Sequence, residues 1–198
     1  MLTLESFKKN WEKKFPDISI KHTHFIIAVS GGIDSVGQTY MMHVLGAKCT
    51  IAHVNFQLRG SESIRDEQFV TDFANRLKMP FKINRFETAT YAQTYKMGIQ
   101  QAAREIRYAW FDQLIKEFKE NLTGTNSRVV LLTAHHADDQ VETVLMQLFR
   151  GTGLHGLTGI PDFRSNSIQV CRPLLGFTKS EIIGFAKEYS LTYVEDSS

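Results

Sequence analysis

The most distinctive stretch of the sequence is a short run of serines and glycines between an apolar segment and a helical pattern. Paired glycines let phosphate oxygens approach the backbone amides, and serines add hydroxyl donors. The helix that follows points the positive end of its dipole toward an anion. We therefore predict a phosphate-binding loop, with a simple helix-capping turn as the structural alternative. The members of this loop are Ser30, Gly31, Gly32, Ile33, Asp34 and Ser35.

Asp34 is unexpected in a loop that binds anions, because a carboxylate repels phosphate. The simplest explanation is that Asp34 faces a metal ion that bridges to the phosphate. The loop also lacks the lysine of the GxxxxGK[ST] motif and is shorter than that motif. It is therefore not the phosphate-binding loop of the common ATPases.

A second group of reactive side chains follows the most apolar run of the chain. Asp138, Asp139 and Glu142 are spaced three and four residues apart, so a helix places them near one face. Such carboxylates can hold Mg²⁺, bind a cationic substrate, or merely complement the helix dipole. Of the two histidines before them, His136 could orient a phosphate or take a proton, or be a hydrogen-bonded structural residue. No cysteine lies near, so zinc is not expected.

A third candidate is Arg107, on a predicted helix whose other side is apolar. A guanidinium fork matches the geometry of phosphate oxygens, so Arg107 could stabilise charge on a phosphate. The alternative is a structural ion pair with Glu105 or another acid.

Hydrophobic periodicity predicts the elements that must position these residues. Strands are expected at 24–29, 49–55, 81–86, 128–134 and 168–171. Helices are expected at 4–15, 36–45, 63–77, 99–118, 138–149 and 178–189. Gly46 is expected to cap the C-terminus of the second helix, and capping boxes are expected at Ser63 and Thr178. This alternation predicts an α/β fold with a doubly wound, mainly parallel sheet and helices on both faces. Such sheets bind ligands beyond the carboxyl ends of their strands, where the candidate residues lie.

Composition excludes several classes of protein. The 198 residues, 42% of them hydrophobic, fit one compact domain. A net charge of +2 does not by itself indicate a nucleic-acid binder. Two distant cysteines exclude a disulfide scaffold and suit a reducing cytosol, and no apolar run approaches the ~20 residues of a membrane span. We expect a soluble, cytoplasmic protein with no membrane partner.

Residues 151–156 match GxGxxG but follow a helix, so they are predicted to be a loop.

The loop at residues 30–35 resembles the SGGxDS loop of the ATP pyrophosphatase (PP-loop) superfamily, whose fold is described as adenine nucleotide alpha hydrolase-like. Members of this superfamily cleave ATP between its α- and β-phosphates. Further stretches narrow the resemblance to the N-terminal catalytic domain of the bacterial tRNA(Ile)-lysidine synthetases, over nearly the whole chain. These stretches are residues 53–60, 101–108, 134–143, 148–157, 172–175 and 195–198. Phe56 departs from the family, which often has His or another polar residue there, so the contacts of that loop are left open.

The resemblance implies a ligase that forms a C–N bond. In that reaction ATP adenylates the C2 oxygen of the wobble cytidine in a tRNA(Ile) with a CAU anticodon, and pyrophosphate leaves. Free L-lysine then displaces AMP. The implied catalytic residues are Asp34, Arg107, His136, Asp138, Asp139 and Glu142. ATP would bind at the loop, and Asp34 and Asp139 would hold Mg²⁺.

The resemblance also implies a domain organisation. Residues 1–22 are expected to form an amphipathic helix packed on the core, and residues 23–198 the ATP pyrophosphatase catalytic domain. The family's C-terminal tRNA-binding domains would lie outside this chain. We therefore expect it to bind ATP and Mg²⁺ but to bind tRNA weakly and with strong salt sensitivity. Its oligomeric state is open between a monomer and a homodimer.

Two other functions are compatible with the phosphate loop. A tRNA-thiolating enzyme of the same superfamily activates a base oxygen in the same way, but it needs sulfur-handling cysteines or an iron–sulfur cluster. Cys49 and Cys171 are isolated and offer neither. A nucleotide-binding module without turnover would keep the loop but has no need of the acidic cluster. Release of pyrophosphate from ATP, and the second substrate it requires, discriminates between these functions.

Overall fold

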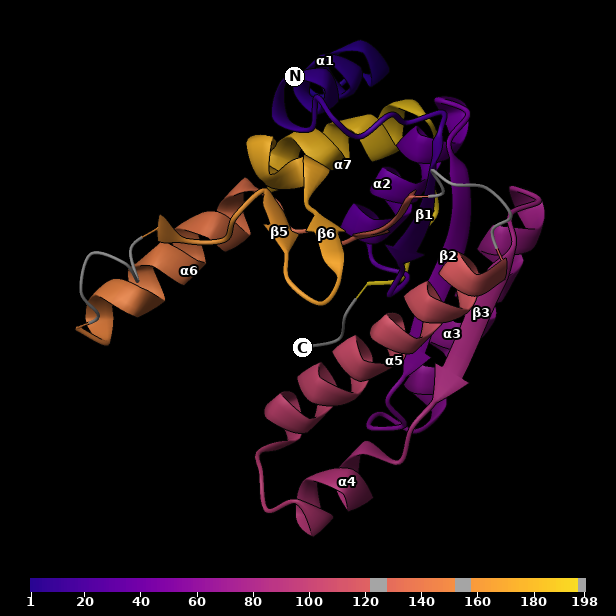
Figure 1. The fold of residues 1–198 in the computed structure, drawn as a ribbon. Coiled ribbons are helices and arrows are strands. Elements are labelled where there is room, and N and C mark those ends of the chain that lie inside the picture. Colours follow the sequence, from indigo (N-terminus) through magenta and orange to yellow (C-terminus); the bar gives the residue numbers. More distant parts are fainter. Residues whose placement is uncertain (122–127, 152–157, 196–198) are drawn as a thin grey trace.

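The computed structural model describes residues 1–121, 128–151 and 158–195 (Figure 1). The strands within these ranges are β1 (Thr23–Ala28), β2 (Lys48–Asn55), β3 (Phe81–Arg85), β4 (Arg128–Leu132), β5 (Phe163–Ser165) and β6 (Gln169–Cys171). The helices are α1 (Leu4–Lys14), α2 (Ile33–Val44), α3 (Ser61–Arg76), α4 (Thr88–Thr94), α5 (Ile99–Asn121), α6 (Ala137–Phe149), the 3-10 helix η2 (Pro173–Gly176) and α7 (Lys179–Glu188).

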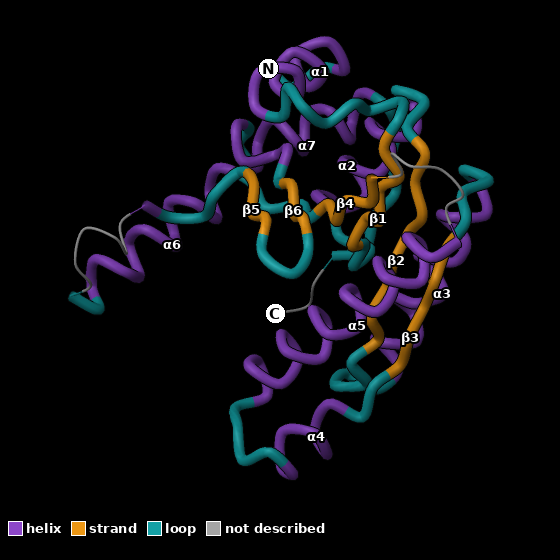
Figure 2. Tube along the Cα trace, in the orientation of Figure 1, coloured by secondary structure: helices purple, strands orange, loops and turns teal. Residues whose placement is uncertain are grey.

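These strands form one sheet in the order β3-β2-β1-β4-β6-β5 (Figure 2). All neighbours are parallel except β5, which pairs antiparallel with β6 at the edge. The chain runs outward from β1 to β2 and β3, and then returns to β4 on the other side of β1. The predicted doubly wound, mainly parallel sheet is therefore confirmed. The strand order reverses between β1 and β4, and such a reversal opens a crevice at the carboxyl ends of the strands.

Helices cover both faces of the sheet because right-handed crossovers in opposite directions place their helices on opposite sides. Residues of α1, α2, α3 and α7 share one hydrophobic cluster with the central strands. Trp11 of α1 is 2% exposed and its ring meets Phe25 of β1 edge-on, with centroids 5.3 Å apart. The other cluster packs α5 against the opposite face, through residues such as Phe111 and Leu114. Burial on both faces explains why β1 and β4 are continuously apolar.

Several element boundaries differ from the sequence prediction. Helix α2 begins at Ile33 rather than at residue 36, so half of the phosphate loop forms its first turn. Helix α3 begins at Ser61 after Gly60, and the predicted capping box at Ser63 is wrong. Ser63 Oγ instead accepts a hydrogen bond from the Arg59 amide, 3.1 Å away, in the loop that precedes the helix. By contrast, the box at Thr178 is confirmed, as is Gly46, whose φ of +72° closes α2 in a left-handed turn.

Three elements have no counterpart in the sequence prediction: α4, η2 and the edge strand β5. Each is short, and short segments carry too few residues for a period to be read. Residues 122–127, 152–157 and 196–198 lie outside the described ranges, and with them most of the GxGxxG match at residues 151–156. In the part of the chain that the structure describes, no helix has the length and apolar character that would let it cross a membrane.

Candidate active site

The loop between β1 and α2 is closed by hydrogen bonds among its own residues. The Ser30 amide donates to Ser35 Oγ (3.3 Å), the Gly32 amide donates to Ser30 Oγ (3.2 Å), and Ser35 Oγ donates to the Gly32 carbonyl (2.9 Å). Gly31 has a φ of +103°, which only glycine adopts without strain. Gly32 caps α2 without a side-chain hydrogen bond, so the first amides of the helix are available to an anion.

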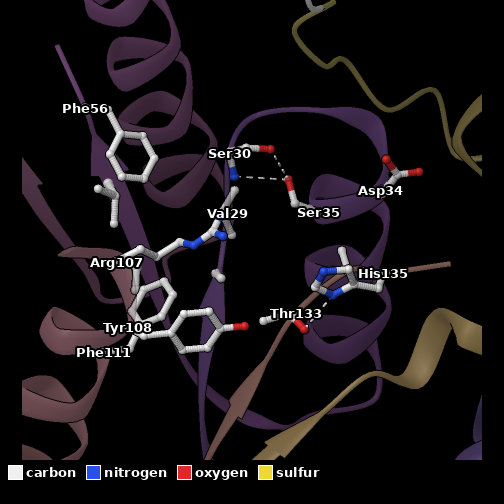
Figure 3. A pocket seen from close by; sticks show the side chains of 14 residues that line it. Val29, Ser30, Asp34, Ser35, Phe56, Arg107, Tyr108, Phe111, Thr133 and His135 are labelled. Carbon is white, nitrogen blue, oxygen red and sulfur yellow. Dashed lines mark hydrogen bonds between the residues drawn. The ribbon is translucent and has the colours of Figure 1, made fainter. Parts of the chain in front are cut away.

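A pocket opens next to this loop at the point where β1, β2 and β4 end (Figure 3). Asp34 and Ser35 line it from the first turn of α2, and Thr133 and His135 line it from the segment after β4. Its remaining walls come from β1, from β2 and the residues after it, and from α5. The lining residues are Ala28, Val29, Ser30, Asp34, Ser35, Ala52, Val54, Phe56, Arg107, Tyr108, Phe111, Thr133, Ala134 and His135. Polar groups therefore gather around the loop, and the opposite wall is apolar apart from Arg107 and Tyr108.

Arg107 lies on the α5 wall of this pocket, between Phe56 and Tyr108 (Figure 3). Burial lowers its pKa from the ordinary value, and repulsion from Arg104 adds to this effect. The alternative structural ion pair does not form, because no carboxylate among the described residues pairs with Arg107. Glu105 instead accepts a hydrogen bond from Gln101. The Arg107 guanidinium thus faces the cavity from the side opposite the loop at residues 30–35.

His135 also lines the pocket, and the sequence assigned it no specific role. Its Nδ1 lies 3.0 Å from Thr133 Oγ1. Burial lowers the pKa of His135 to about 4, and the positive charges of Arg172, Arg107 and Arg104 contribute. His135 is therefore a neutral imidazole at physiological pH.

The next residue, His136, has three of the predicted carboxylates around its ring. Its Nε2 lies 3.8 Å from Asp34 Oδ1 and 3.7 Å from Asp139 Oδ2, and its Nδ1 lies 3.6 Å from Asp138 Oδ2. These distances are those of ion pairs rather than of hydrogen bonds. The side chain is 11% exposed, and its Nδ1 has no hydrogen-bond partner. A buried ring nitrogen without a partner thus lies among acidic neighbours.

Lys179, the first residue of α7, joins this cluster although sequence reasoning missed it. Its ammonium lies 2.8 and 2.7 Å from the two carboxylate oxygens of Asp34. Its backbone amide donates to Asp138 Oδ2 at 2.6 Å. Lys179 and Asp34 are 145 residues apart, so no sequence spacing could have paired them. One residue thus ties the phosphate loop to the start of α6.

The other predicted site residues have distinct surroundings. Ile33 is 7% exposed and its side chain packs in the core, so only its backbone can meet a ligand. Asp139 accepts a hydrogen bond from the His136 amide at 2.8 Å, which caps α6. Glu142 lies one turn further along α6 and is exposed. The structure therefore brings Asp34, His136 and the two aspartates together and leaves Glu142 at the rim.

The oxygen donors of this cluster suit Mg²⁺, which proteins bind through one or two carboxylates together with substrate phosphates. Asp34 and Asp139 both approach the same nitrogen of His136, and Asp34 already accepts a cation, the Lys179 ammonium. Within the described ranges, no three His, Cys, Asp or Glu side chains are grouped to hold a metal ion alone. The two carboxylates therefore fit an ion that phosphate and water complete.

Comparison with known proteins identifies the family of this chain. Residues 3–198 match the family model described as the PP-loop domain. The chain belongs to the PP-loop family. ATP binding follows for this PP-loop domain from its family.

The relatives of this PP-loop domain include long bacterial proteins. It is 42% identical to a tRNA(Ile)-lysidine synthase of Parabacteroides distasonis over 173 residues, which is 87% of this chain and 37% of the relative. It is 38% identical to one of Chlorobaculum tepidum, covering 86% of this chain and 50% of the relative. The chain thus spans half or less of these relatives.

Solved structures confirm the fold of this PP-loop domain. A U34-tRNA thiolase, NcsA from Methanococcus maripaludis, superposes with a TM-score of 0.74 over 97% of this chain and 66% of the thiolase chain. The two are only 16% identical, so the likeness establishes the shared adenine nucleotide alpha hydrolase-like fold and nothing more.

Proposed function

We propose that this PP-loop domain is the catalytic part of a tRNA(Ile)-lysidine synthetase. The enzyme would adenylate the C2 oxygen of the wobble cytidine in a tRNA(Ile) with a CAU anticodon, and then join free L-lysine to C2 with release of AMP. The observation that carries the proposal is that the phosphate loop and Arg107 line one pocket, and that Asp34, which also lines it, reaches the His136 carboxylate cluster. Identity of 38 to 42% to lysidine synthases supports it.

In the first step the residues of the pocket position ATP for attack at its α-phosphate. The amides of the Ser30–Ser35 loop and the dipole of α2 hold the phosphates, and Asp34 and Asp139 would hold Mg²⁺. Mg²⁺ supplies neutralisation of phosphate charge when it is bound. Arg107 faces the loop across the cavity and stabilises the charge that develops as the cytidine oxygen attacks and pyrophosphate leaves (Figure 3).

In the second step lysine attacks C2 of the adenylated base, and the C–O bond to AMP breaks. The attacking amine must be neutral, so its ammonium has to lose a proton first. His136 is the base that the geometry favours, because its Nδ1 has no hydrogen-bond partner and carboxylates surround the ring. Asp138, Asp139 and the exposed Glu142 provide negative charge for the lysine ammonium.

Thiolation is disfavoured by the surroundings of the two cysteines. Cys49 and Cys171 are both buried in the sheet, 6% and 0% exposed. Burial raises the pKa of each thiol to about 12, whereas sulfur chemistry and cluster ligation require thiolates. Neither cysteine lines the pocket.

The proposal is tested by following ATP in the presence of every combination of L-lysine and a tRNA(Ile) transcript with a CAU anticodon. AMP and pyrophosphate should form only with the tRNA, and lysidine should appear in the tRNA only when lysine is also present. An ADP product would contradict the chemistry, since the loop lacks the lysine used in γ-phosphoryl transfer. Incorporation of sulfur instead of lysine, or pyrophosphate release that ignores tRNA, would contradict the substrate.

A further inference from the structure

A group of arginines surrounds Tyr108 beyond the edge of the nucleotide pocket, and the proposed function uses only one of them. The guanidinium carbons of Arg104, Arg107 and Arg164 lie 5.2, 5.7 and 5.3 Å from the Tyr108 ring centroid. Arg172 joins them from the residue after β6. It is 4% exposed; burial lowers its pKa, Arg164 and Arg104 lower it further, and Tyr108 opposes this shift. Helix α5 and the β5–β6 hairpin thus bring four positive charges to one tyrosine.

These charges are not neutralised by acidic side chains of the protein. Among the residues that the structure describes, none of the four arginines forms an ion pair with a carboxylate. Burial and mutual repulsion lower the pKa values of Arg107 and Arg172. The Nε atoms of Arg164 and Arg172 are buried without a hydrogen-bond partner. Gathering unpaired guanidinium groups costs free energy, so the arrangement indicates an anionic ligand.

Two of the four arginines already have a place in the structure described above. Arg172 donates to the Pro161 carbonyl at 2.8 Å, so it also holds the start of the hairpin. Arg107 lines the nucleotide pocket. Arg104 and Arg164 do neither. Arg104 is exposed on α5, and Arg164 is half-buried on the edge strand β5.

We infer that Arg104 and Arg164 bind phosphates of the RNA strand on either side of the base that enters the pocket. Tyr108 connects the two places, because it lines the nucleotide cavity and lies within 5.3 Å of both guanidinium groups. A base delivered to the α-phosphate of ATP carries its own flanking phosphates to the rim of that cavity. Arginine binds phosphate in a bidentate fashion, and an aromatic ring beside it offers a surface for a neighbouring base. This inference rests on the proposed function for its choice of RNA.

Equilibrium binding tests the inference without any turnover. The ligand is a fluorescent anticodon stem-loop RNA of tRNA(Ile), titrated at a series of KCl concentrations with the wild-type protein, Arg104→Ala, Arg164→Ala and Arg76→Ala. Arg76 is a matched control, because it lies on α3 across the sheet and donates to Thr192 instead of joining the group. ATP affinity and the melting temperature are measured for each variant.

Arg104→Ala and Arg164→Ala should each weaken RNA binding about tenfold and reduce the slope of log affinity against log salt by about one. Their ATP affinity and melting temperature should stay those of the wild type, and Arg76→Ala should change none of these quantities. Unchanged RNA affinity and salt slope in both variants would overturn the inference. A loss of ATP affinity with RNA binding intact would also overturn it, because the arginines would then serve the nucleotide. If RNA binding falls as expected but no lysidine forms in the activity assay, the site stands and the proposed function fails.

Discussion

At the scale of single residues, the pairing of Asp34 with Lys179 gives the sharpest prediction. Asp34→Asn keeps the size of the side chain and removes the charge that faces the cation. We expect pyrophosphate release to fall at least about 100-fold, because charge complementarity at such a position contributes several kcal/mol. The melting temperature should change little, since the Lys179 side chain is 40% exposed and water can solvate it.

Asp112→Asn is the matched control for this change. Asp112 also pairs with a lysine, Lys116 at 2.6 Å, but on the outer surface of α5. Its loss should leave turnover at the wild-type level. Retention of more than about a tenth of the activity in Asp34→Asn would remove Asp34 from the catalytic machinery.

His135 predicts a specific dependence of stability on pH. The folded protein keeps this imidazole neutral down to its lowered pKa of about 4, whereas the ordinary value is 6.5. Between these values the unfolded chain binds more protons, so stability falls as the pH drops from about 6.5 toward 4. The free energy of unfolding of the wild type should therefore fall on going from pH 7 to pH 4.5. In His135→Gln this fall should be smaller by about 2 kcal/mol. Urea denaturation at both pH values measures this, and parallel losses in the two proteins would contradict it.

Sequence reasoning at this scale succeeded where the chemistry is local. The residues of the 30–35 loop follow a strand directly, so their place at its carboxyl end could be predicted from the sequence. Tyr108 and Lys179 could not be identified in the same way. Tyr108 reads as one more aromatic on an amphipathic helix, and Lys179 reaches Asp34 only because α7 packs beside α2.

At the scale of elements, the turn from β1 into α2 depends on the left-handed backbone conformation of Gly31. An alanine Cβ at Gly31 would lie 3.3 Å from Phe69 Cδ1 and 3.4 Å from Val194 Cγ2, at a φ of +103°. Gly46 also has a positive φ, +72°, but a Cβ there meets nothing within 4 Å. Both Gly31→Ala and Gly46→Ala should cost about 1 to 2 kcal/mol of stability, because both place a side chain in left-handed backbone.

Only Gly31→Ala should also weaken ATP binding, because the crowding at Phe69 and Val194 displaces the loop that carries the phosphate-binding amides. The backbone carbonyl of Gly31 further accepts a hydrogen bond from the Val194 amide at 2.9 Å, which fixes the loop from the far end of the chain. Calorimetric titration with ATP compares the two variants. Equal ATP affinity for both would show that the loop tolerates the shift.

The helix starts show what local sequence can and cannot determine. Thr178 and Glu181 cap α7 as predicted, because both partners of the box are contiguous and nothing competes for them. The Ser63 box fails because Asn55, at the end of β2, donates to the Ser63 carbonyl and holds this turn from outside the helix. This contact joins residues eight positions apart, which is further than a four-residue capping motif extends.

At the scale of the whole molecule, the alternation of strands and helices was enough to predict the parallel sheet, but not its order. The pairing of β1 with both β2 and β4 decides where the crevice opens, and this pairing depends on the direction of each crossover rather than on any residue pattern. The edge strand β5 was missed for a related reason. It is three residues long and exists only because β6 offers it a partner.

Charge distribution over the whole molecule leads to the last prediction. The chain carries a net charge of only +2, and in its described part Arg104, Arg107 and Arg164, which have no carboxylate partner, lie around Tyr108. Affinity for a nucleic acid at physiological salt rises with the number of phosphates that a protein neutralises. A domain that offers a few such contacts should bind tRNA weakly, while its affinity for ATP should not depend on these contacts. We therefore compare this chain with the full-length Parabacteroides distasonis relative, of which it matches 37%. ATP affinities should agree within about threefold, whereas tRNA(Ile) affinity should be at least about tenfold weaker for the shorter protein and should fall strongly as the salt concentration rises. Equal tRNA affinities with equal salt slopes would show that the residues of this PP-loop domain supply all the contacts that tRNA binding requires.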